Sequence, residues 1–146
     1  MADSKSKSER IGFPPELIQT RLHRLLIETY RQPSEAPKGK IKVSSEVEIK
    51  ISDDDAQQLV CFSKITVHGE CMETEERVFT AECTMIGIFK VNKTFEQNES
   101  IHHGDVMLLA NYINPLAAET IEANISRAGY GSIQLPRNFK HEASAE

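Results

Sequence analysis

The sequence predicts an α+β fold in which an antiparallel β-meander is followed by helices. Apolar and polar residues alternate over residues 41–51 and again over 76–91, and β-branched and aromatic residues fill 59–67. Short polar segments separate these three stretches, as expected for strands joined in a meander. The last third of the chain instead carries apolar residues three and four apart, which is typical of helices.

Size and charge limit the organisation and the partners. The chain has 146 residues, 39% of them hydrophobic, which suits one domain and excludes a wholly disordered chain. We expect that domain over residues 13–139, between flexible polar tails at 1–12 and 140–146. Seventeen Lys and Arg against 22 Asp and Glu give a net charge of −5, which argues against nucleic acid as the main partner.

The first ordered element is predicted to be a helix over about residues 15–23. Pro15 suits a first helical turn, because its missing N–H needs no partner there. The apolar residues that follow keep to one helical face: Leu17, Ile18, Leu22, Leu25 and Leu26. From Leu25 to Tyr30 the pattern fits either more helix or an extended strand, so both alternatives stay open on the residues alone.

Two helices are predicted near the C-terminal end. Asp105 can cap a short helix over 106–110, and Asn114 with Pro115 forms the usual start of a second one. Gly129 is expected to end that second helix. Its inward stripe is Ala117, Ala118, Ile121, Ile125 and Ala128.

The cysteines and the absence of a long apolar run predict a cytoplasmic protein. No stretch approaches the roughly 18 apolar residues of a membrane span, and the polar N-terminus does not resemble a secretory signal. Cys61, Cys71 and Cys83 are odd in number and have no C-x-x-C spacing, so we expect reduced, buried thiols.

The candidate catalytic and metal-binding groups are weak. His102 and His103, beside Glu99 and Asp105, form the best metal candidate, but adjacent side chains diverge and a solvated loop is favoured. A nucleophilic Cys paired with a His has no local signature, and neither a G-x-S-x-G turn nor a glycine-rich phosphate loop is present. We therefore expect a binding protein without enzymatic activity, cofactor or metal.

Acidic residues gather in the middle of the chain. Ten Asp and Glu lie between Asp53 and Glu99 against four Lys and Arg, a local charge of 4 − 10 = −6. Most fall in turns, where solubility and protection of sheet edges account for them. Glu82 differs because it lies within a strand, where it would add to a flat acidic surface suited to a basic partner.

Three segments resemble the SecB family of protein-export chaperones. The run from Asn114 to Tyr130 has a Pro and Ala opening, apolar residues at helical spacing, and an Ile-Ser-Arg-Ala ending with an aromatic residue shortly after. An Ile-Gln-Leu-Pro-Arg-Asn-Phe segment follows it at 133–139, and Phe79-Thr80-Ala81-Glu82 leading to Gly87-Ile88-Phe89 resembles a long strand of the family. Together the likeness covers about residues 22–139.

The resemblance implies an assembly and a function. It implies about four antiparallel strands with helices on one face, Leu25–Ser34 as an edge strand, and a homotetramer built as a dimer of dimers. The subunit-interface residues would be Ala117, Ala118, Ile121 and Ile125. Such chaperones hold unfolded polypeptides in apolar grooves without nucleotide and, in the export branch, deliver preproteins to the SecA ATPase.

The same resemblance points to binding residues. Phe79 matches an aromatic position of the family's groove, and Glu82 matches an acid on the sheet face that contacts SecA. The further peptide-binding candidates are Ile86, Ile88, Phe89, Tyr112, Ile113 and Leu116. We expect the long C-terminal helix of export chaperones to be missing or reduced to a stub here, and Gly12–Leu22 to be extra. The alternative is therefore a dedicated adaptor or chaperone for a single partner, such as the antitoxin of a toxin–antitoxin pair.

Overall fold

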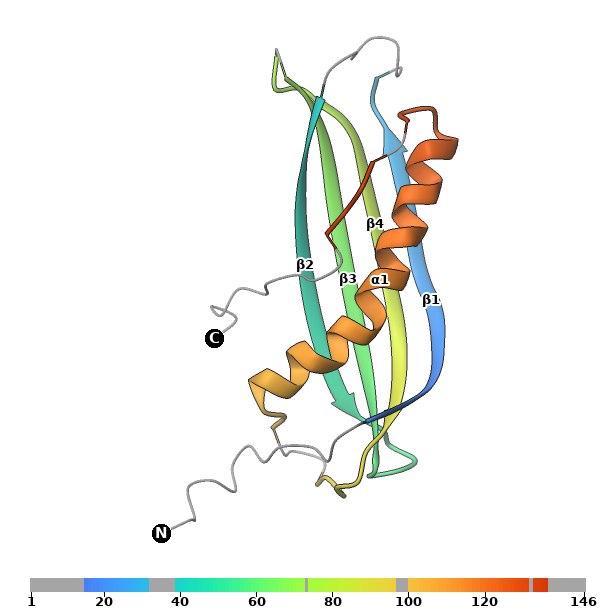
Figure 1. Cartoon of the computed structure of the whole chain (residues 1–146), viewed down its shortest axis with the longest axis vertical. Coiled ribbons are helices and arrows are strands. Elements are labelled where there is room, and N and C mark those ends of the chain that lie inside the picture. Colours follow the sequence, from blue (N-terminus) through green and yellow to red (C-terminus); the bar gives the residue numbers. More distant parts are fainter. Residues whose placement is uncertain (1–14, 32–38, 73, 97–99, 132, 137–146) are drawn as a thin grey trace.

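One antiparallel sheet and one long helix make up the fold (Figure 1). The computed structural model describes residues 15–31, 39–72, 74–96, 100–131 and 133–136. In chain order the elements are β1 (Glu16–Thr29), β2 (Gly39–Ile51), β3 (Gln58–Cys71), β4 (Arg77–Lys90) and α1 (His103–Arg127). The predicted tails at 1–12 and 140–146 lie outside the described residues.

The sheet has the spatial order β1-β4-β3-β2, and each neighbouring pair is antiparallel. Strands β2, β3 and β4 form the predicted meander, so the α+β class with an antiparallel sheet is confirmed. Strand β1 lies at the edge beside β4, which also confirms the extended conformation expected from Leu25 for the residues as far as Thr29. Of the rest of that predicted edge strand, residues 30–31 lie beyond the end of β1, and 32–34 lie outside the described residues.

The predicted helix over 15–23 is wrong, because these residues begin β1. Two irregularities in the pairing with β4, between Leu17 and Gln19 and between Leu22 and Arg24, each insert an extra residue. A bulge shifts the alternation of the strand by one position. Leu22 and Leu25 therefore face the same side although they are three apart, a spacing that imitates a helix.

The two faces of the sheet differ. Along β3 every second residue from Leu59 to Cys71 is buried, and these residues face α1. Ile113 of α1 lies over Gly87, which places the alternate residues of β4 from Phe79 to Phe89 on this helix face as well. The opposite, open face carries the intervening residues, most of them polar. The main core consequently lies between α1 and the two central strands.

A single helix replaces the two that were predicted. Helix α1 runs from His103 to Arg127 and contains Pro115 in its interior. Proline lacks the N–H that would bond to the carbonyl of Asn111, four residues earlier, and the exposed position of Asn111 lets water meet that carbonyl. Asp105 lies in the first turn, and His102 is the cap: its Nδ1 accepts from the Gly104 N–H at 3.0 Å.

The chain reverses direction after α1. Gly129 has a φ of 95°, a left-handed conformation that glycine adopts freely, and it follows the helix as predicted. Residues 133–136 then run back along the helix face of the sheet, beside β3 and β2 (Figure 1). None of the described helices is long and apolar enough to span a membrane.

Candidate functional site

Helix α1 leaves part of the apolar face of the sheet on which it packs uncovered. It contacts all four strands but crosses the sheet obliquely, so that its start and end lie over different strands (Figure 1). The central strands are buried beneath it, whereas the apolar residues of the outer strands are only partly buried. On the helix face these are Leu17, Leu25, Ile27, Ile41, Val43, Val47, Ile49 and Ile51. Apolar surface consequently remains on both flanks of the helix.

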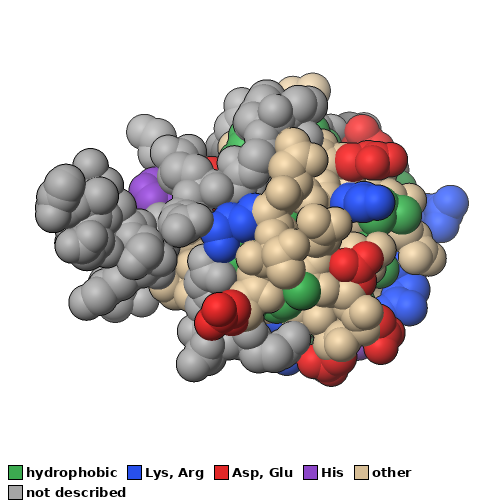
Figure 2. Space-filling view, turned by 90° about the horizontal axis from the view of Figure 1, so that it is seen from below, with side chains coloured by type: hydrophobic (Ala, Val, Ile, Leu, Met, Phe, Trp, Pro, Cys, Tyr) green, Lys and Arg blue, Asp and Glu red, His purple; other side chains and the backbone are tan. Residues whose placement is uncertain are grey.

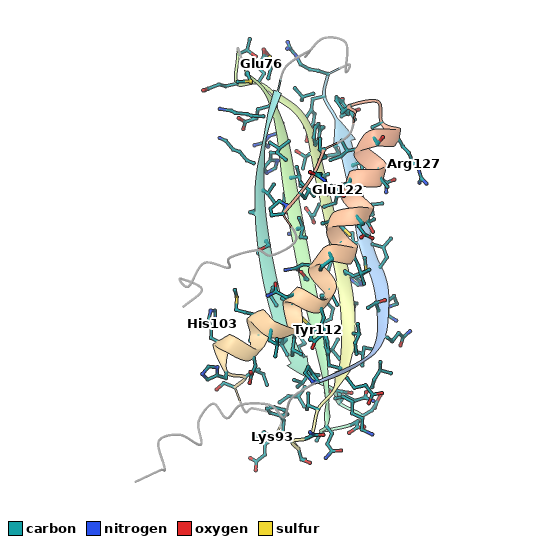
Figure 3. The ribbon with its side chains drawn as sticks, viewed as in Figure 1. Glu76, Lys93, His103, Tyr112, Glu122 and Arg127 are labelled. Carbon is teal, nitrogen blue, oxygen red and sulfur yellow. The ribbon has the colours of Figure 1, made fainter. Side chains whose placement is uncertain are left out.

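The first uncovered area, here the β1-side surface, consists of Leu17, Leu22, Tyr112 and Leu116. Tyr112 projects from α1 (Figure 3). Leu116 lies four residues later and so shares this flank of the helix, and the two side chains are 39% and 37% exposed. The Tyr112 ring lies 5.7 Å from that of Phe89, whose partner on β1 is Leu17. Leu22, further along β1, is 47% exposed.

The second area, here the β2-side groove, lies on the other flank and is lined by Ile41, Phe79, Tyr130 and Ile133. Together with Lys40 and Glu70, these side chains line a cavity of about 160 Å³. The Phe79 ring packs at 5.0 Å against Tyr130, whose hydroxyl donates to the Arg31 carbonyl. Ile133, the first described residue of the returning segment, therefore lies at this groove and leaves part of it unfilled.

The structure brings together only some of the predicted peptide-binding residues. Phe89, Tyr112 and Leu116 belong to or adjoin the β1-side surface, and the fully buried Ile113 lies beneath it. Phe79 lies in the β2-side groove and is 5% exposed. Ile86 and Ile88 lie on the open face instead, because neighbouring residues of a strand point to opposite faces. One groove cannot contain both sets.

The residues predicted for a subunit interface face the chain's own sheet. Ala117, Ala118, Ile121 and Ile125 all have 0% exposure and belong to the hydrophobic core. Their spacing indicated one face of the helix correctly, but that face is the one that packs on β3 and β4. A contact of this helix with a second subunit would use its exposed residues, such as Tyr112 and Leu116.

Glu82 lies on the open face between two cations. Its Oε2 is 4.0 Å from Nη1 of Arg24 on β1 and 3.6 Å from Nζ of Lys64 on β3. Further along, Lys42 pairs with Glu70 at 3.5 Å. The open face is therefore mixed in charge around Glu82, in contrast to the flat acidic surface expected from the sequence. Acidic and basic side chains also lie near one another at the lower end of the molecule (Figure 2).

The described residues offer little for covalent or metal chemistry. Cys61, Cys71 and Cys83 are all buried, as predicted. Burial raises the pKa of Cys61 to about 12 and that of Cys83 to about 11, which disfavours the nucleophilic thiolate. No group of three metal-ligating side chains occurs among the described residues, and Glu99 of the predicted histidine site lies outside them.

On the open face, His68 Nδ1 lies 3.1 Å from Thr80 Oγ1. Burial, followed by the nearby charge of Arg77, lowers the pKa of His68. The resulting preference for a neutral ring suits a hydrogen bond between two uncharged groups on neighbouring strands. The contact therefore ties β3 to β4 and does not mark a catalytic pair.

A solved structure shares this arrangement of sheet and helix. The SecB-like chaperone Rv1957 of Mycobacterium tuberculosis, in complex with a ChAD peptide from the Rv1956 HigA1 antitoxin, matches with a TM-score of 0.70 over 84% of this chain and 88% of that one. This chain has a SecB-like fold. Only 14% of the aligned residues are identical, so the likeness concerns the SecB-like fold alone.

Other comparisons add little. A Streptococcus agalactiae protein of unknown function matches over 84% of this chain and 98% of its own, at 16% identity and a TM-score of only 0.38. No family model matches the sequence, and no curated protein does.

Proposed function

We propose that this protein is a nucleotide-independent chaperone that holds non-native polypeptides on the apolar surfaces beside α1. The observation that carries the proposal is the exposed apolar surface beside α1: Leu22 of β1 and Tyr112 and Leu116 of α1 are each more than a third exposed. Exposed apolar area of this kind is costly in water and binds apolar segments of other chains. A protein that binds unfolded chains and not folded ones acts by mass action and needs no chemistry.

The SecB-like fold supports this proposal, because the chaperone Rv1957 has the same arrangement and its solved structure contains a bound peptide. Delivery of unfolded preproteins to SecA is the wider form of the proposal, with Glu82 as a contact residue. Operation in the cytoplasm as a homotetramer, a dimer of dimers, belongs to it as well. An assembly would cover some of the exposed apolar surface and leave the remainder for clients.

A dedicated role for one partner is the second candidate. The peptide in the Rv1957 complex comes from an antitoxin, which favours an antitoxin segment as the partner here. The two candidates differ in breadth: a general chaperone binds many unrelated unfolded chains, whereas a dedicated adaptor binds one. A pull-down from cell lysate followed by identification of the captured chains separates them.

The direct test is suppression of aggregation. Citrate synthase unfolds and scatters light on heating, and its scattering is followed with and without equimolar protein in nucleotide-free buffer. The proposal predicts that scattering falls by more than half and that added ATP changes nothing. Unchanged scattering at a fivefold excess would contradict it.

A further inference from the structure

We propose that residues Ile133–Pro136 are an internal occupant of the β2-side groove, which a client displaces by placing its own extended apolar segment there. The inference rests on the proposed function and specifies both the class of segment bound and the step that controls its access. It is argued from the backbone hydrogen bond of these four residues, the alternation of their side chains and the cavity beside them.

The backbone of the segment is held by a side chain of the helix. The Leu135 N–H donates to Glu122 Oε2 at 2.7 Å, and Glu122 lies on the part of α1 beside the returning chain (Figure 3). A carboxylate that accepts from an amide forms a charge-assisted hydrogen bond. Because every residue except proline has such an N–H, this contact would accept almost any extended segment.

The side chains of the segment alternate. Ile133 and Leu135 point into the protein, where Leu135 is 5% exposed, whereas Gln134 and Pro136 are exposed. Alternation with a period of two is the pattern of an extended chain lying on a surface. The groove is therefore expected to select segments with apolar residues at positions i and i+2 and an amide N–H at the second.

The occupant fills its site incompletely. The cavity of about 160 Å³ is lined by Ile133, Ile41 and Phe79, with Lys40 and Glu70 also at its wall. Apolar side chains larger than isoleucine would make contacts there that the internal segment does not make, and such contacts are the source of packing energy. A client segment with an aromatic residue in place of Ile133 would thus compete favourably.

Competition from within the chain has a measurable consequence. A tethered segment has a high effective concentration, so it weakens the apparent affinity for any other segment that needs the same place. If only a fraction of molecules has the groove open, the apparent Kd is the intrinsic Kd divided by that fraction. Detaching the internal segment should therefore tighten client binding.

The variant Leu135→Asp tests this, because it places a charge at the buried anchor, and Gln134→Asp is the matched control with the same charge on an exposed neighbour. The probe is reduced, carboxymethylated α-lactalbumin, a permanently unfolded chain, and its Kd is measured by fluorescence anisotropy. We expect at least tenfold tighter binding for Leu135→Asp and less than twofold change for Gln134→Asp. Equal or weaker binding by a folded Leu135→Asp protein would overturn the inference. If neither the unaltered protein nor the variants bind the probe, the proposed function fails instead.

A second experiment remains decisive if Leu135→Asp does not fold. The variant Glu122→Ala removes the acceptor of the backbone hydrogen bond and introduces a residue that favours helix. A peptide with the sequence of residues 129–136 is added to this variant and to the unaltered protein, and hydrogen exchange of the Leu135 amide is followed in both.

We expect faster exchange in Glu122→Ala, and we expect the unaltered protein not to bind the added peptide. Where Leu135→Asp does fold, that protein should bind the peptide as well, and N-methylation of the peptide's leucine should weaken the binding about tenfold or more, as the loss of a charge-assisted hydrogen bond implies. Unchanged exchange in Glu122→Ala would contradict the role of Glu122 as the anchor.

Discussion

The ring of Phe79 lies directly over the backbone of Gly69, its partner on the neighbouring strand. A Cβ at Gly69 would stand 2.2 Å from Cε2 of that ring, far inside van der Waals contact. The glycine thus lets an aromatic ring lie against the backbone of β3, and the Tyr130 ring packs on that ring at 5.0 Å. The floor of the β2-side groove depends on this pair.

Gly69→Ala should destabilise the protein by about 1–3 kcal/mol, because the added methyl group forces the Phe79 ring out of position. Urea unfolding measures the loss. The double variant Gly69→Ala/Phe79→Leu should be less destabilised than the sum of its two single variants, since the smaller side chain leaves room for the methyl group. Additive losses would mean that the two residues are not coupled.

Replacing Ser63 alone should destabilise the protein more than replacing Ser63 and Asn114 together. Both are fully buried, the Ser63 hydroxyl donates to Asn114 Oδ1, and Asn114 Nδ2 has no hydrogen-bond partner among the described residues. Ser63→Ala removes the remaining partner of a buried amide and should cost about 1–3 kcal/mol. Ser63→Ala/Asn114→Leu removes both polar groups and should unfold at a higher urea concentration than Ser63→Ala. Unfolding of the double variant at a lower urea concentration than Ser63→Ala would contradict this account.

Pro115→Ala should stabilise the protein by about 1 kcal/mol or more, because alanine restores an N–H for the Asn111 carbonyl in the middle of α1. The measurement is the thermal midpoint Tm, which should rise by several degrees. Glu119→Ala, at an exposed position of the same helix, is the control and should change Tm little. A lower Tm for Pro115→Ala would show that the proline ring contributes packing that outweighs the missing hydrogen bond.

The buried thiols should resist alkylation at pH 8. Their raised pKa values leave almost no thiolate, so iodoacetamide should modify Cys61 and Cys83 only after unfolding in guanidinium, as read by mass spectrometry. A raised folded pKa also predicts that stability falls as pH rises above 9, because the unfolded thiols ionise there and the folded ones do not. Cys61→Ala/Cys83→Ala should reduce that slope. Rapid alkylation of the folded protein would contradict the burial.

The sequence predicted the central meander because β2, β3 and β4 are regular. It misassigned the first half of β1, since two bulges convert the period of two into spacings of three that resemble a helix. Local pattern cannot reveal a bulge, because the extra residue is defined by its partner on β4. The residues alone left Leu25–Tyr30 open between helix and strand, and the likeness to SecB decided in favour of an edge strand.

The site was predicted less completely than the fold. The sequence indicates the apolar residues of β4 but assigns them all to one groove, although they lie on two faces of the sheet. Phe79 and Phe89 face α1, whereas Ile86 and Ile88 face away. Alternation along the strand could have separated them. The roles of Glu122 and Leu135 could not be predicted, because their contact joins a helix to a segment that returns across the sheet.

The central claim is that the exposed apolar flank of α1 binds non-native chains, and Leu116→Asp tests it most directly. The substitution places a charge at a side chain that is 37% exposed, so the fold should persist. Ser44→Asp, at an exposed position on the open face, is the matched control. The measurement is the Kd for carboxymethylated α-lactalbumin without nucleotide, with the assembly state checked by light scattering. We predict at least tenfold weaker binding for Leu116→Asp and none of this loss for Ser44→Asp. Equal affinity of the unaltered protein and Leu116→Asp would contradict the account.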